Sequence, residues 1–343
     1  MRAASAARTR GDGPPMASDG TDIGPVGAAH VPVLEGLVVG GLRPRPGARL
    51  VDATIGLGGH AAALLAAAPD TELLGLDHDP VALARTRARL AAFGDRVRLR
   101  ESSFAALGAA LDALGWDGAD AILLDLGVSS MQLDDVARGF SFRAAAPLDM
   151  RMGPGAPHTA ADLVNLADER ELARILRDYG EEPRARAIAR AVVRARPIAT
   201  TTALADLVAR VAGRGKPGHH PATRTFQAIR IAVNDELGAL DAFLADGWRR
   251  LRPGGRLAIL AYHSLEDRRV KTAFRHWAAD CHCPPHVVRC VCGWRPTVRL
   301  VTARAVRPDA DEIARNPRAR SARLRIVERL ASGGSAGANP REL

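Results

Sequence analysis

The sequence is poor in lysine and has no long apolar run. No apolar segment approaches the ~20 residues that a membrane-spanning helix requires, so we expect a soluble protein without a membrane partner. Residues 1–28 lack the continuous apolar core of a secretory signal, and their Arg, Ala, Ser, Gly and Pro content predicts a disordered N-terminal extension. We therefore expect a cytoplasmic protein, with a second disordered stretch at residues 331–343.

Arginine takes the place of lysine almost everywhere. Lys216 and Lys271 are the only lysines, so 46 of the 48 basic residues are arginine. The net charge of +10 and the pI of about 10.6 indicate a polyanionic partner such as nucleic acid. Abundant arginine and alanine are also typical of a GC-rich genome, so the basicity supports an RNA partner without establishing one. A chain of 343 residues, 47% hydrophobic, is long enough for two domains or for one large domain with an insertion.

A glycine-rich turn follows the first predicted strand. The segment Val51–His60 is apolar up to Asp52 and then turns through Gly56, Gly58 and Gly59. Glycine lets a backbone approach a ligand closely, and the helix predicted next would direct its first N–H groups at the ligand. The order of the acid and the glycines does not match G-x-G-x-x-G, which disfavours a dinucleotide and its pyrophosphate.

Polar residues follow each of the later predicted strands. These strands, with the residues after them, are Glu72–Leu76 with Asp77, Arg96–Arg100 with Ser102–Phe104, Ala121–Leu124 with Asp125, and Leu257–Ala261 with Tyr262–Arg268. In an open α/β sheet ligands bind at the carboxyl ends of the strands, and Asp77 has the spacing of an acid that holds ribose hydroxyls. Each acid alone is equally typical of a helix cap. Together they favour S-adenosylmethionine, which has a ribose, an adenine and a charged amino-acid tail but no pyrophosphate.

About 120 residues separate the fourth predicted strand from the fifth, which implies an inserted domain. Helical patterns cover Ala160–Leu176, Arg184–Arg196 and Thr202–Val211, and the second of these carries five arginines. A solvated face and an RNA-binding face are equally good interpretations of that basic helix.

A longer helix is predicted for Ala222–Leu251. A buried stripe is formed by Phe226, Ile229, Val233, Leu237, Leu240 and Leu244. A polar stripe beside it contains Thr223, Gln227, Arg230 and Asn234. The polar stripe is interpreted either as the lining of a substrate cleft between insertion and sheet or as a simple hydrogen-bonding face.

Several longer motifs make the chain recognisable. They are His30–Leu34, Asp52–His60, Asp125–Asp134, Arg138–Phe142, Pro147–Met152, Tyr179–Glu182, His220–Ala228, His263–Arg268 and Asn316–Ala322. In this order, over residues 28–330, the chain closely resembles the bacterial small-subunit ribosomal RNA methyltransferase H family, formerly called MraW. The resemblance implies an α/β fold: a class I (Rossmann-like) S-adenosylmethionine-dependent methyltransferase sheet with an inserted helical domain. We expect the methyltransferase domain at residues 29–134 and 222–330 and the insertion at residues 135–221.

The family resemblance also implies an activity and a set of cofactor contacts. The activity is transfer of a methyl group from S-adenosylmethionine to the exocyclic N4 of a cytidine in the decoding region of 16S rRNA, within the small ribosomal subunit. The implied contacts are Gly58, Gly59 and His60 in the glycine loop, Asp77 on the ribose, Phe104 beside the adenine, Asp125 at the fourth strand tip, and Gln132 just beyond it. Ala261-Tyr262 and Glu101-Ser102 depart from the family's commoner residues but keep the general chemistry.

The reaction needs activation of the amino group, because the nitrogen lone pair of cytosine is delocalised into the ring. Hydrogen-bond acceptors at the N–H groups would restore electron density at that nitrogen. We expect Asp125 to position cofactor and amino group, and His263 or a backbone carbonyl near Gly127 to accept a proton. Since no aromatic residue adjoins Asp125, stacking on the base is assigned to Tyr262 or Phe140.

The four cysteines lie in one short segment as Cys281-His282-Cys283 and Cys290-Val291-Cys292. Four sulfurs this close are compatible with zinc, but C-x-C pairs are less diagnostic than C-x-x-C, and His286 leaves the ligand set ambiguous. Free thiols or an opportunistic disulfide are together favoured over zinc, and no metal site is expected.

Two other classes of function compete with the rRNA methyltransferase. A methyltransferase for a protein or small molecule would not need a basic insertion and a basic C-terminal stretch. A non-catalytic RNA-binding or ribosome-assembly protein would not need an intact glycine loop with its acids. The oligomeric state does not follow from the sequence.

Overall fold

The computed structural model describes residues 32–213, 220–284, 287 and 289–331, which all belong to one compact unit, Val31–Leu343. The disorder expected at residues 1–28 and nearly all of the expected C-terminal tail lie outside the described residues, as does His286. Within the part of the chain that the structure describes, no helix is long and apolar enough to cross a membrane.

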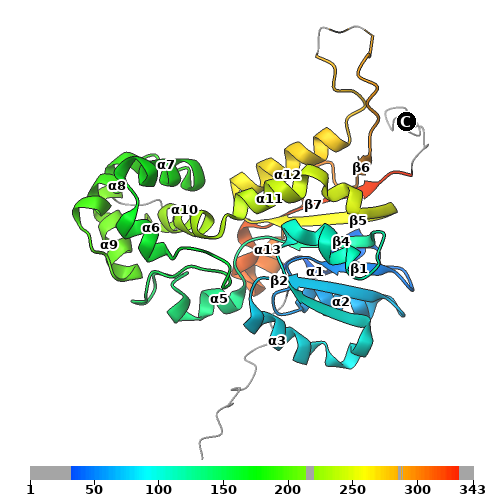
Figure 1. The fold of residues 1–343 in the computed structure, drawn as a ribbon, viewed down its shortest axis with the longest axis horizontal. Helices are drawn as coiled ribbons and strands as arrows, with labels where there is room; N and C mark the ends of the chain where they lie inside the picture. Colours follow the sequence, from blue (N-terminus) through cyan, green and yellow to red (C-terminus); the bar gives the residue numbers. More distant parts are fainter. Residues whose placement is uncertain (1–31, 214–219, 285–286, 288, 332–343) are drawn as a thin grey trace, which may run out of the picture. The chain divides into compact units, whose positions relative to one another are not determined.

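A seven-stranded sheet in the order β3-β2-β1-β4-β5-β7-β6 forms the centre of the fold (Figure 1). The strands are β1 Arg49–Asp52, β2 Glu72–Asp77, β3 Val97–Glu101, β4 Ala119–Asp125, β5 Leu251–Ala261, β6 Val298–Leu300 and β7 Arg323–Arg329. Strands β1 to β5 run parallel, while β7 is antiparallel to both β5 and β6. This doubly wound order confirms the expected Rossmann-like α/β fold.

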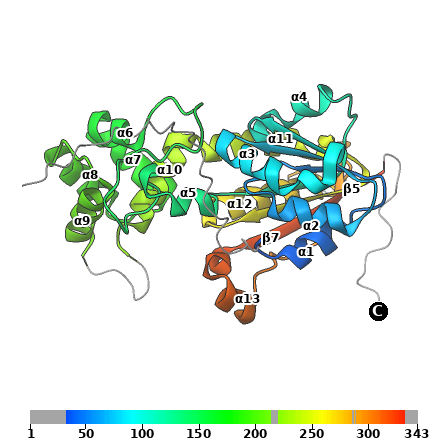
Figure 2. The ribbon, with the colours of Figure 1, turned by 90° about the horizontal axis from the view of Figure 1, so that it is seen from below.

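Both faces of the sheet are buried, as the nearly continuous apolar strands require. In β4, Ile122 and Leu124 belong to one core and Leu123 to the other, because neighbouring side chains of a strand point to opposite faces. The first core is covered by α4 Leu107–Asp112, α11 Glu236–Asp246 and α12 Ser264–Trp277. The second is covered by α1 Glu35–Leu42, α2 Gly59–Ala67 and α3 Pro80–Arg89. The sheet is thus the middle layer of three, and Figure 2 shows helices above and below it.

The chain between β4 and β5 contains the expected helical insertion. After α5 Ser130–Asp134, its helices are α6 Ala160–Leu166, α7 Glu169–Gly180, α8 Ala185–Arg194, α9 Thr201–Ala212 and α10 Thr223–Asn234. Helices α6 to α10 gather around a third core (Figure 1). The single helix predicted for Ala160–Leu176 is wrong, because α6 ends at Leu166 and Asp168 caps the next helix by accepting a bond from Glu171 N at 2.7 Å.

The single helix predicted for Ala222–Leu251 is also wrong. Asp235 adopts a left-handed conformation with φ 47°, which ends α10 and starts α11. The predicted apolar stripe is buried throughout, but it divides among three clusters, of which the smallest contains Leu237. Phe226 of α10 packs in the helical core, whereas Leu240 of α11 packs against the sheet. The helical core therefore extends past residue 221, where we placed the end of the insertion.

The structure also contains elements that the sequence did not indicate. Strand β6 and helix α13 Ala310–Arg315 had no pattern strong enough to predict them. Strand β5 begins at Leu251, six residues before the predicted start, and includes the Pro253-Gly254-Gly255 segment.

Candidate functional site

The glycine loop joins β1 to α2 at the carboxyl edge of the parallel strands. Gly58 has φ 73° and forms the N-cap of α2, a left-handed conformation that favours glycine. A Cβ on Gly59 would lie 2.6 Å from the Pro32 ring, so only glycine allows this packing. The loop is also fixed to the neighbouring strand tip, because Gly56 N donates to the Asp77 carboxylate at 2.8 Å. The result is a close, rigid turn in front of a helix N-terminus.

Asp77 ends β2 and organises two backbone segments. Its Oδ2 accepts from Gly56 N at 2.8 Å, and its Oδ1 accepts from Asp79 N at 2.9 Å. Burial raises the pKa of this carboxyl, although both backbone hydrogen bonds oppose the shift. Each carboxylate oxygen has a second lone pair, so hydroxyl groups of a ligand can still donate to it.

Asp52 at the end of β1 is a buried acid whose role the sequence did not reveal. It is 2% exposed and accepts one long hydrogen bond from Thr54 N at 3.3 Å. Its pKa is raised to about 7, mainly by burial; His60 and the hydrogen bond from Thr54 N oppose the increase, and the carboxyls of Asp125 and Asp77 add to it. Three acids therefore gather at the ends of β1, β2 and β4.

Asp125 at the end of β4 is held by residues from two other elements. The Tyr262 hydroxyl donates to Asp125 Oδ1 at 2.7 Å, and His60 Nδ1 lies 3.6 Å from Oδ2. Burial first, and then the Asp125 charge, hold the pKa of Tyr262 well above its ordinary value, so the phenol keeps its proton and donates. His60 Nε2 must donate to the Val33 carbonyl at 2.9 Å, which leaves Nδ1 facing the carboxylate.

Phe104 follows β3, and Gln132 follows β4 in helix α5. The Phe104 ring makes an edge-to-face contact with Phe243 of α11 at 6.2 Å. Gln132 is buried in the first turn of α5, where its Oε1 accepts from Ser129 N at 2.9 Å in a capping box. Its Nε2 donates to Met152 O at 3.4 Å, which links α5 to the segment before α6.

A second link ties that segment to the tip of β2. Arg138 forms an ion pair with the buried Asp79 at 2.5 Å and donates to the carbonyls of Arg151 and Met152 at 2.9 and 3.0 Å. Gly153 lies so close to His78 that a Cβ would meet its carbonyl oxygen at 2.4 Å. No local pattern assigns a role to Arg138, but its partner is signalled by Asp79-Pro80, which is a recognisable helix start.

His263 lies at the N-cap of α12 and faces Glu266. Its Nδ1 accepts from Glu266 N at 3.4 Å, and Nε2 is 3.1 Å from Glu266 Oε1, without the orientation of a hydrogen bond. Glu236 is also close enough for these three side chains to form a candidate metal cluster. Arg230 already binds both carboxylate oxygens of Glu236, at 2.7 and 2.8 Å, and supplies the positive charge there.

The polar stripe of α10 makes internal hydrogen bonds. Asn234 accepts from Met152 N and donates to Met150 O, both at 2.7 Å, and Gln227 donates to Tyr179 O at 3.1 Å. These bonds support the interpretation of a hydrogen-bonding face. Phe140, one of two residues expected to stack on a base, is 8% exposed in the helical core, so Tyr262 is the better placed of the two.

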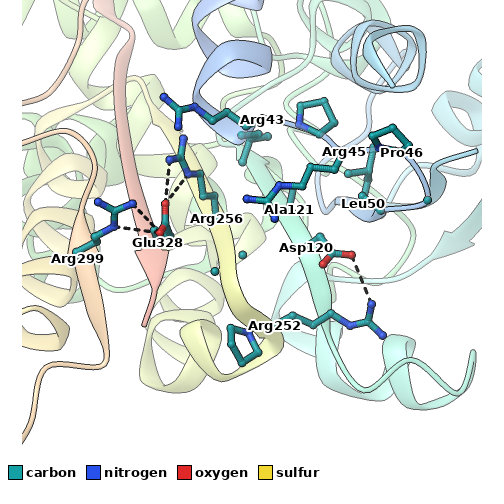
Figure 3. A pocket seen from close by; sticks show the side chains of 17 residues that line it. Arg43, Arg45, Pro46, Leu50, Asp120, Ala121, Arg252, Arg256, Arg299 and Glu328 are labelled. Atoms are coloured by element: carbon teal, nitrogen blue, oxygen red, sulfur yellow. Dashed lines mark hydrogen bonds and ion pairs between the residues drawn. The ribbon is translucent and has the colours of Figure 1, made fainter. Parts of the chain in front are cut away.

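A pocket of about 310 Å³ lies at the opposite, amino edge of the sheet (Figure 3). Its charged lining consists of Arg43, Arg45, Asp120, Arg252, Arg256, Arg299 and Glu328. The acids here are paired: Glu328 binds Arg256 at 2.9 Å and Arg299 at 2.8 Å, and Asp120 lies 3.6 Å from Arg252. None of the residues expected to bind the cofactor lines this pocket.

The chain was compared with known proteins. The model of the MraW methylase family matches residues 27–330. The chain belongs to the MraW methylase family. This membership confirms the resemblance and the expected methyltransferase class, because the match covers both the sheet and the helical insertion.

Curated members of the family share about half of their residues with this chain. "Ribosomal RNA small subunit methyltransferase H" of Thermomicrobium roseum is 53% identical over 90% of this chain and 96% of its own length. The proteins of that name from Nitratidesulfovibrio vulgaris DP4 and Geobacter sulfurreducens are each 52% identical, over 89% and 88% of this chain and 97% and 99% of their own lengths. A solved rRNA methylase from Streptococcus thermophilus is 15% identical to this chain, with a TM-score of 0.35. The match covers 87% of this chain and 94% of the solved chain.

Proposed function

We propose that this protein transfers a methyl group from S-adenosylmethionine to the exocyclic N4 amino group of a cytidine in the decoding region of 16S rRNA. The family match over residues 27–330, with relatives named for the small-subunit rRNA, carries the proposal. The choice of cytidine N4 follows the family resemblance of the sequence motifs.

The carboxyl edge of the sheet fits the proposed methyl donor by charge. Asp52, Asp77 and Asp125 gather there, and burial raises the pKa of the first two. When bound, S-adenosylmethionine supplies an electrophilic methyl group on a positively charged sulfonium, together with a positive ammonium. A ligand with this charge compensates buried carboxylates, whereas a pyrophosphate would repel them.

We assign the donor-binding contacts to residues of five segments at this edge. Gly58, Gly59 and His60 hold the donor at the glycine loop, Asp77 accepts from the ribose hydroxyls, Phe104 lies beside the adenine, and Asp125 and Gln132 complete the site from β4 and α5. The hydrogen bonds of Asp77 to Gly56 N and Asp79 N support its assignment, because they hold the carboxylate in one orientation.

Asp125 is the proposed catalytic residue. The Tyr262 hydroxyl donates to one of its oxygens, which holds the carboxylate in place at the tip of β4, and His60 Nδ1 lies 3.6 Å from the other oxygen. A carboxylate that accepts a hydrogen bond from the cytosine amino group raises the electron density on nitrogen and orients its lone pair. Carbonyl groups near Gly127 are the second set of acceptors.

His263, which the sequence offers as a candidate proton acceptor, is proposed as a positioning residue. Its ring caps α12 and faces the buried Glu266, and backbone N–H groups of Tyr262 and His263 donate to Glu266 at 2.8 and 3.2 Å. These bonds set the direction of the chain at Tyr262. His263 therefore acts on the site through Tyr262 and its bond to Asp125.

The proposed acceptor is 16S rRNA within the small ribosomal subunit, which the protein would meet in the cytoplasm. Helix α8 has exposed arginines, Arg186, Arg190 and Arg194, and among the described residues Arg190 is the only one of the three that forms an ion pair, with Glu169 at 3.5 Å. Such a surface suits a phosphate backbone, whose contacts with arginine depend on the salt concentration.

The test is methyl transfer from labelled S-adenosylmethionine to small ribosomal subunits, followed by mapping of the modified base. Subunits from a strain that lacks this enzyme should accept close to one methyl group at N4 of one cytidine. Subunits from the parent strain are the matched control, and they should accept almost none because the position is already modified.

The other two functions predict different results. A methyltransferase for a protein or small molecule would leave both kinds of subunit unlabelled while it consumed the donor with another acceptor. A non-catalytic assembly protein would bind subunits without transfer, even with the donor bound. Either outcome would contradict the proposal, and so would a label on a carbon or on a ribose oxygen.

A further inference from the structure

Four cysteine sulfurs lie close together in the segment between α12 and β6, and Figure 1 shows this segment as a long connection that leaves the end of α12 and returns to β6. Cys281 Sγ lies 3.4 Å from Cys290 Sγ and 3.7 Å from Cys292 Sγ. Cys290 Sγ is 3.5 Å from Cys292 Sγ and 3.9 Å from Cys283 Sγ. Cys281 and Cys283 thus come from the start of the segment, and Cys290 and Cys292 follow later in it. All four sulfurs lie within 4.8 Å of one another.

The spacing of these sulfurs matches one tetrahedral metal ion. With zinc–sulfur bonds of about 2.3 Å, neighbouring sulfurs of a tetrahedron lie about 3.8 Å apart. A disulfide requires about 2.05 Å, and all four cysteines are free thiols. A cluster of several iron atoms would hold its sulfurs farther apart than a single ion does.

Backbone N–H groups point at these sulfurs. Cys283 N donates to Cys281 Sγ at 3.2 Å, His282 N to Cys292 Sγ at 3.4 Å, and Val291 N to Cys283 Sγ at 3.4 Å. Such bonds favour the thiolate form, which is the form that binds metals. Three of the four cysteines are exposed, so burial of apolar surface does not explain why they meet.

Aromatic rings pack beside the cluster. His282, between the first two cysteines, stacks on His276 of α12 with ring centroids 4.1 Å apart and packs at an angle against Trp294 with centroids 4.2 Å apart. Trp294 also donates to Ala279 O at 2.9 Å, which attaches the returning chain to the end of α12. The group of side chains whose ligand atoms lie close enough to share one metal ion contains the four cysteines and not His282, so the four sulfurs are the donor set.

We propose that Cys281, Cys283, Cys290 and Cys292 bind one Zn²⁺ ion, which holds together the segment between α12 and β6. Soft thiolate donors in a tetrahedral arrangement select zinc among the abundant divalent metals. Four protein ligands leave no open position for water, so the ion is structural rather than catalytic. The proposal departs from our sequence-based expectation of no metal, because the sequence alone did not bring the two C-x-C pairs together.

Metal analysis of the full-length protein tests this proposal. The protein is produced without a polyhistidine tag, and its zinc content is measured by mass spectrometry after exhaustive dialysis. We expect close to one zinc per chain, and we expect cobalt reconstitution to give the strong visible absorption of a tetrahedral cobalt–thiolate site. A protein without bound metal, whose apo form also fails to bind cobalt, would overturn the proposal.

Variants locate the metal on these cysteines. Cys281→Ser and Cys290→Ser, one from each pair, should each lose most of the zinc and the thiolate absorption. Val291→Ala is the matched control, because Val291 lies between two of the ligands but is 81% exposed. It should retain one zinc per chain. Retention of zinc by both serine variants, iron in place of zinc, or a disulfide found by thiol titration would each contradict the proposal.

Discussion

The two edges of the sheet differ in how their acidic residues are compensated. At the carboxyl edge, Asp52 and Asp77 are largely buried, accept hydrogen bonds mainly from the backbone, and have raised pKa values. At the amino edge, Glu328 is paired with two arginines, which lower its pKa against the effect of burial. Buried acids with little compensating positive charge lower the stability of the folded protein, so their presence indicates that a ligand supplies this charge. Acids that are paired with arginines need no ligand to account for them.

The comparison is sharpest within single strands, because a strand has one end at each edge. Strand β4 begins near Asp120 and ends at Asp125, and β2 begins at Glu72 and ends at Asp77. The two acids of a strand have similar chemistry, but our account gives only the carboxyl-edge acid a function. Paired substitutions therefore test the account with a matched control in the same strand.

The largest effect is expected for Asp125→Asn. An amide keeps the size of the side chain but weakens its acceptor, and we expect turnover to fall roughly 100- to 1,000-fold, as for loss of one preorganised group. Asp120→Asn should keep turnover within about threefold of the unsubstituted protein. Asp120 accepts a hydrogen bond from Arg49 N and lies 3.6 Å from Arg252, and neither contact involves the site. Single-turnover methylation of unmodified small subunits measures both. Equal losses in the two variants would remove the functional difference between the edges.

Asp77→Asn should mainly weaken binding of the donor. Loss of charged hydrogen bonds to the ribose predicts a roughly 10- to 100-fold rise in Kd for S-adenosylmethionine, measured by calorimetry. Glu72→Gln, at the other end of β2, removes only an exposed ion pair with Arg98 and should leave Kd unchanged. Unaltered binding by Asp77→Asn would show that the ribose does not contact this carboxylate.

Asp52→Asn should stabilise the ligand-free protein in a pH-dependent way. The folded pKa of about 7 lies above the ordinary value of 3.8, so this group's contribution to stability falls as the pH rises from about 4 to about 7. Replacing the carboxyl by a neutral amide removes that loss. We expect Tm to increase by roughly 2–4 °C or more at pH 8, and by less at pH 5. A lower Tm at pH 8 would contradict the proposed cost of this buried charge.

The smallest effect is expected for Tyr262→Phe. The substitution removes the 2.7 Å hydrogen bond to Asp125 but keeps the ring. We expect turnover to fall less than about tenfold, in line with the loss of one hydrogen bond. A loss as large as that of Asp125→Asn would indicate that the phenol itself takes part in proton transfer.

Local patterns predicted most of the strands and the motifs of the site. The apolar strands, their polar tips and the 120-residue gap are properties of short or continuous segments, so the sheet and its helical insertion followed from the sequence. The breaks at Asp168 and Asp235 were missed because the apolar spacing continues across them. Nothing in the spacing reveals a left-handed residue such as Asp235.

The contacts that complete the site were beyond sequence reasoning because they join distant residues. Tyr262 and Asp125 are 137 positions apart, and Arg138 and Asp79 are 59 apart. The motifs identified some of these residues as noteworthy but did not pair them. The cysteine cluster follows the same rule, since only the folded segment brings the two C-x-C pairs into contact.

The most direct test of the account is a crystal structure of the protein with S-adenosylhomocysteine. Our account predicts that the ligand lies at the carboxyl edge, with its ribose hydroxyls on Asp77, its adenine beside Phe104 and its sulfur directed toward Asp125. Ligand density in the arginine-lined pocket at the amino edge, or at the carboxyl edge without contact to Asp77 and Asp125, would contradict it.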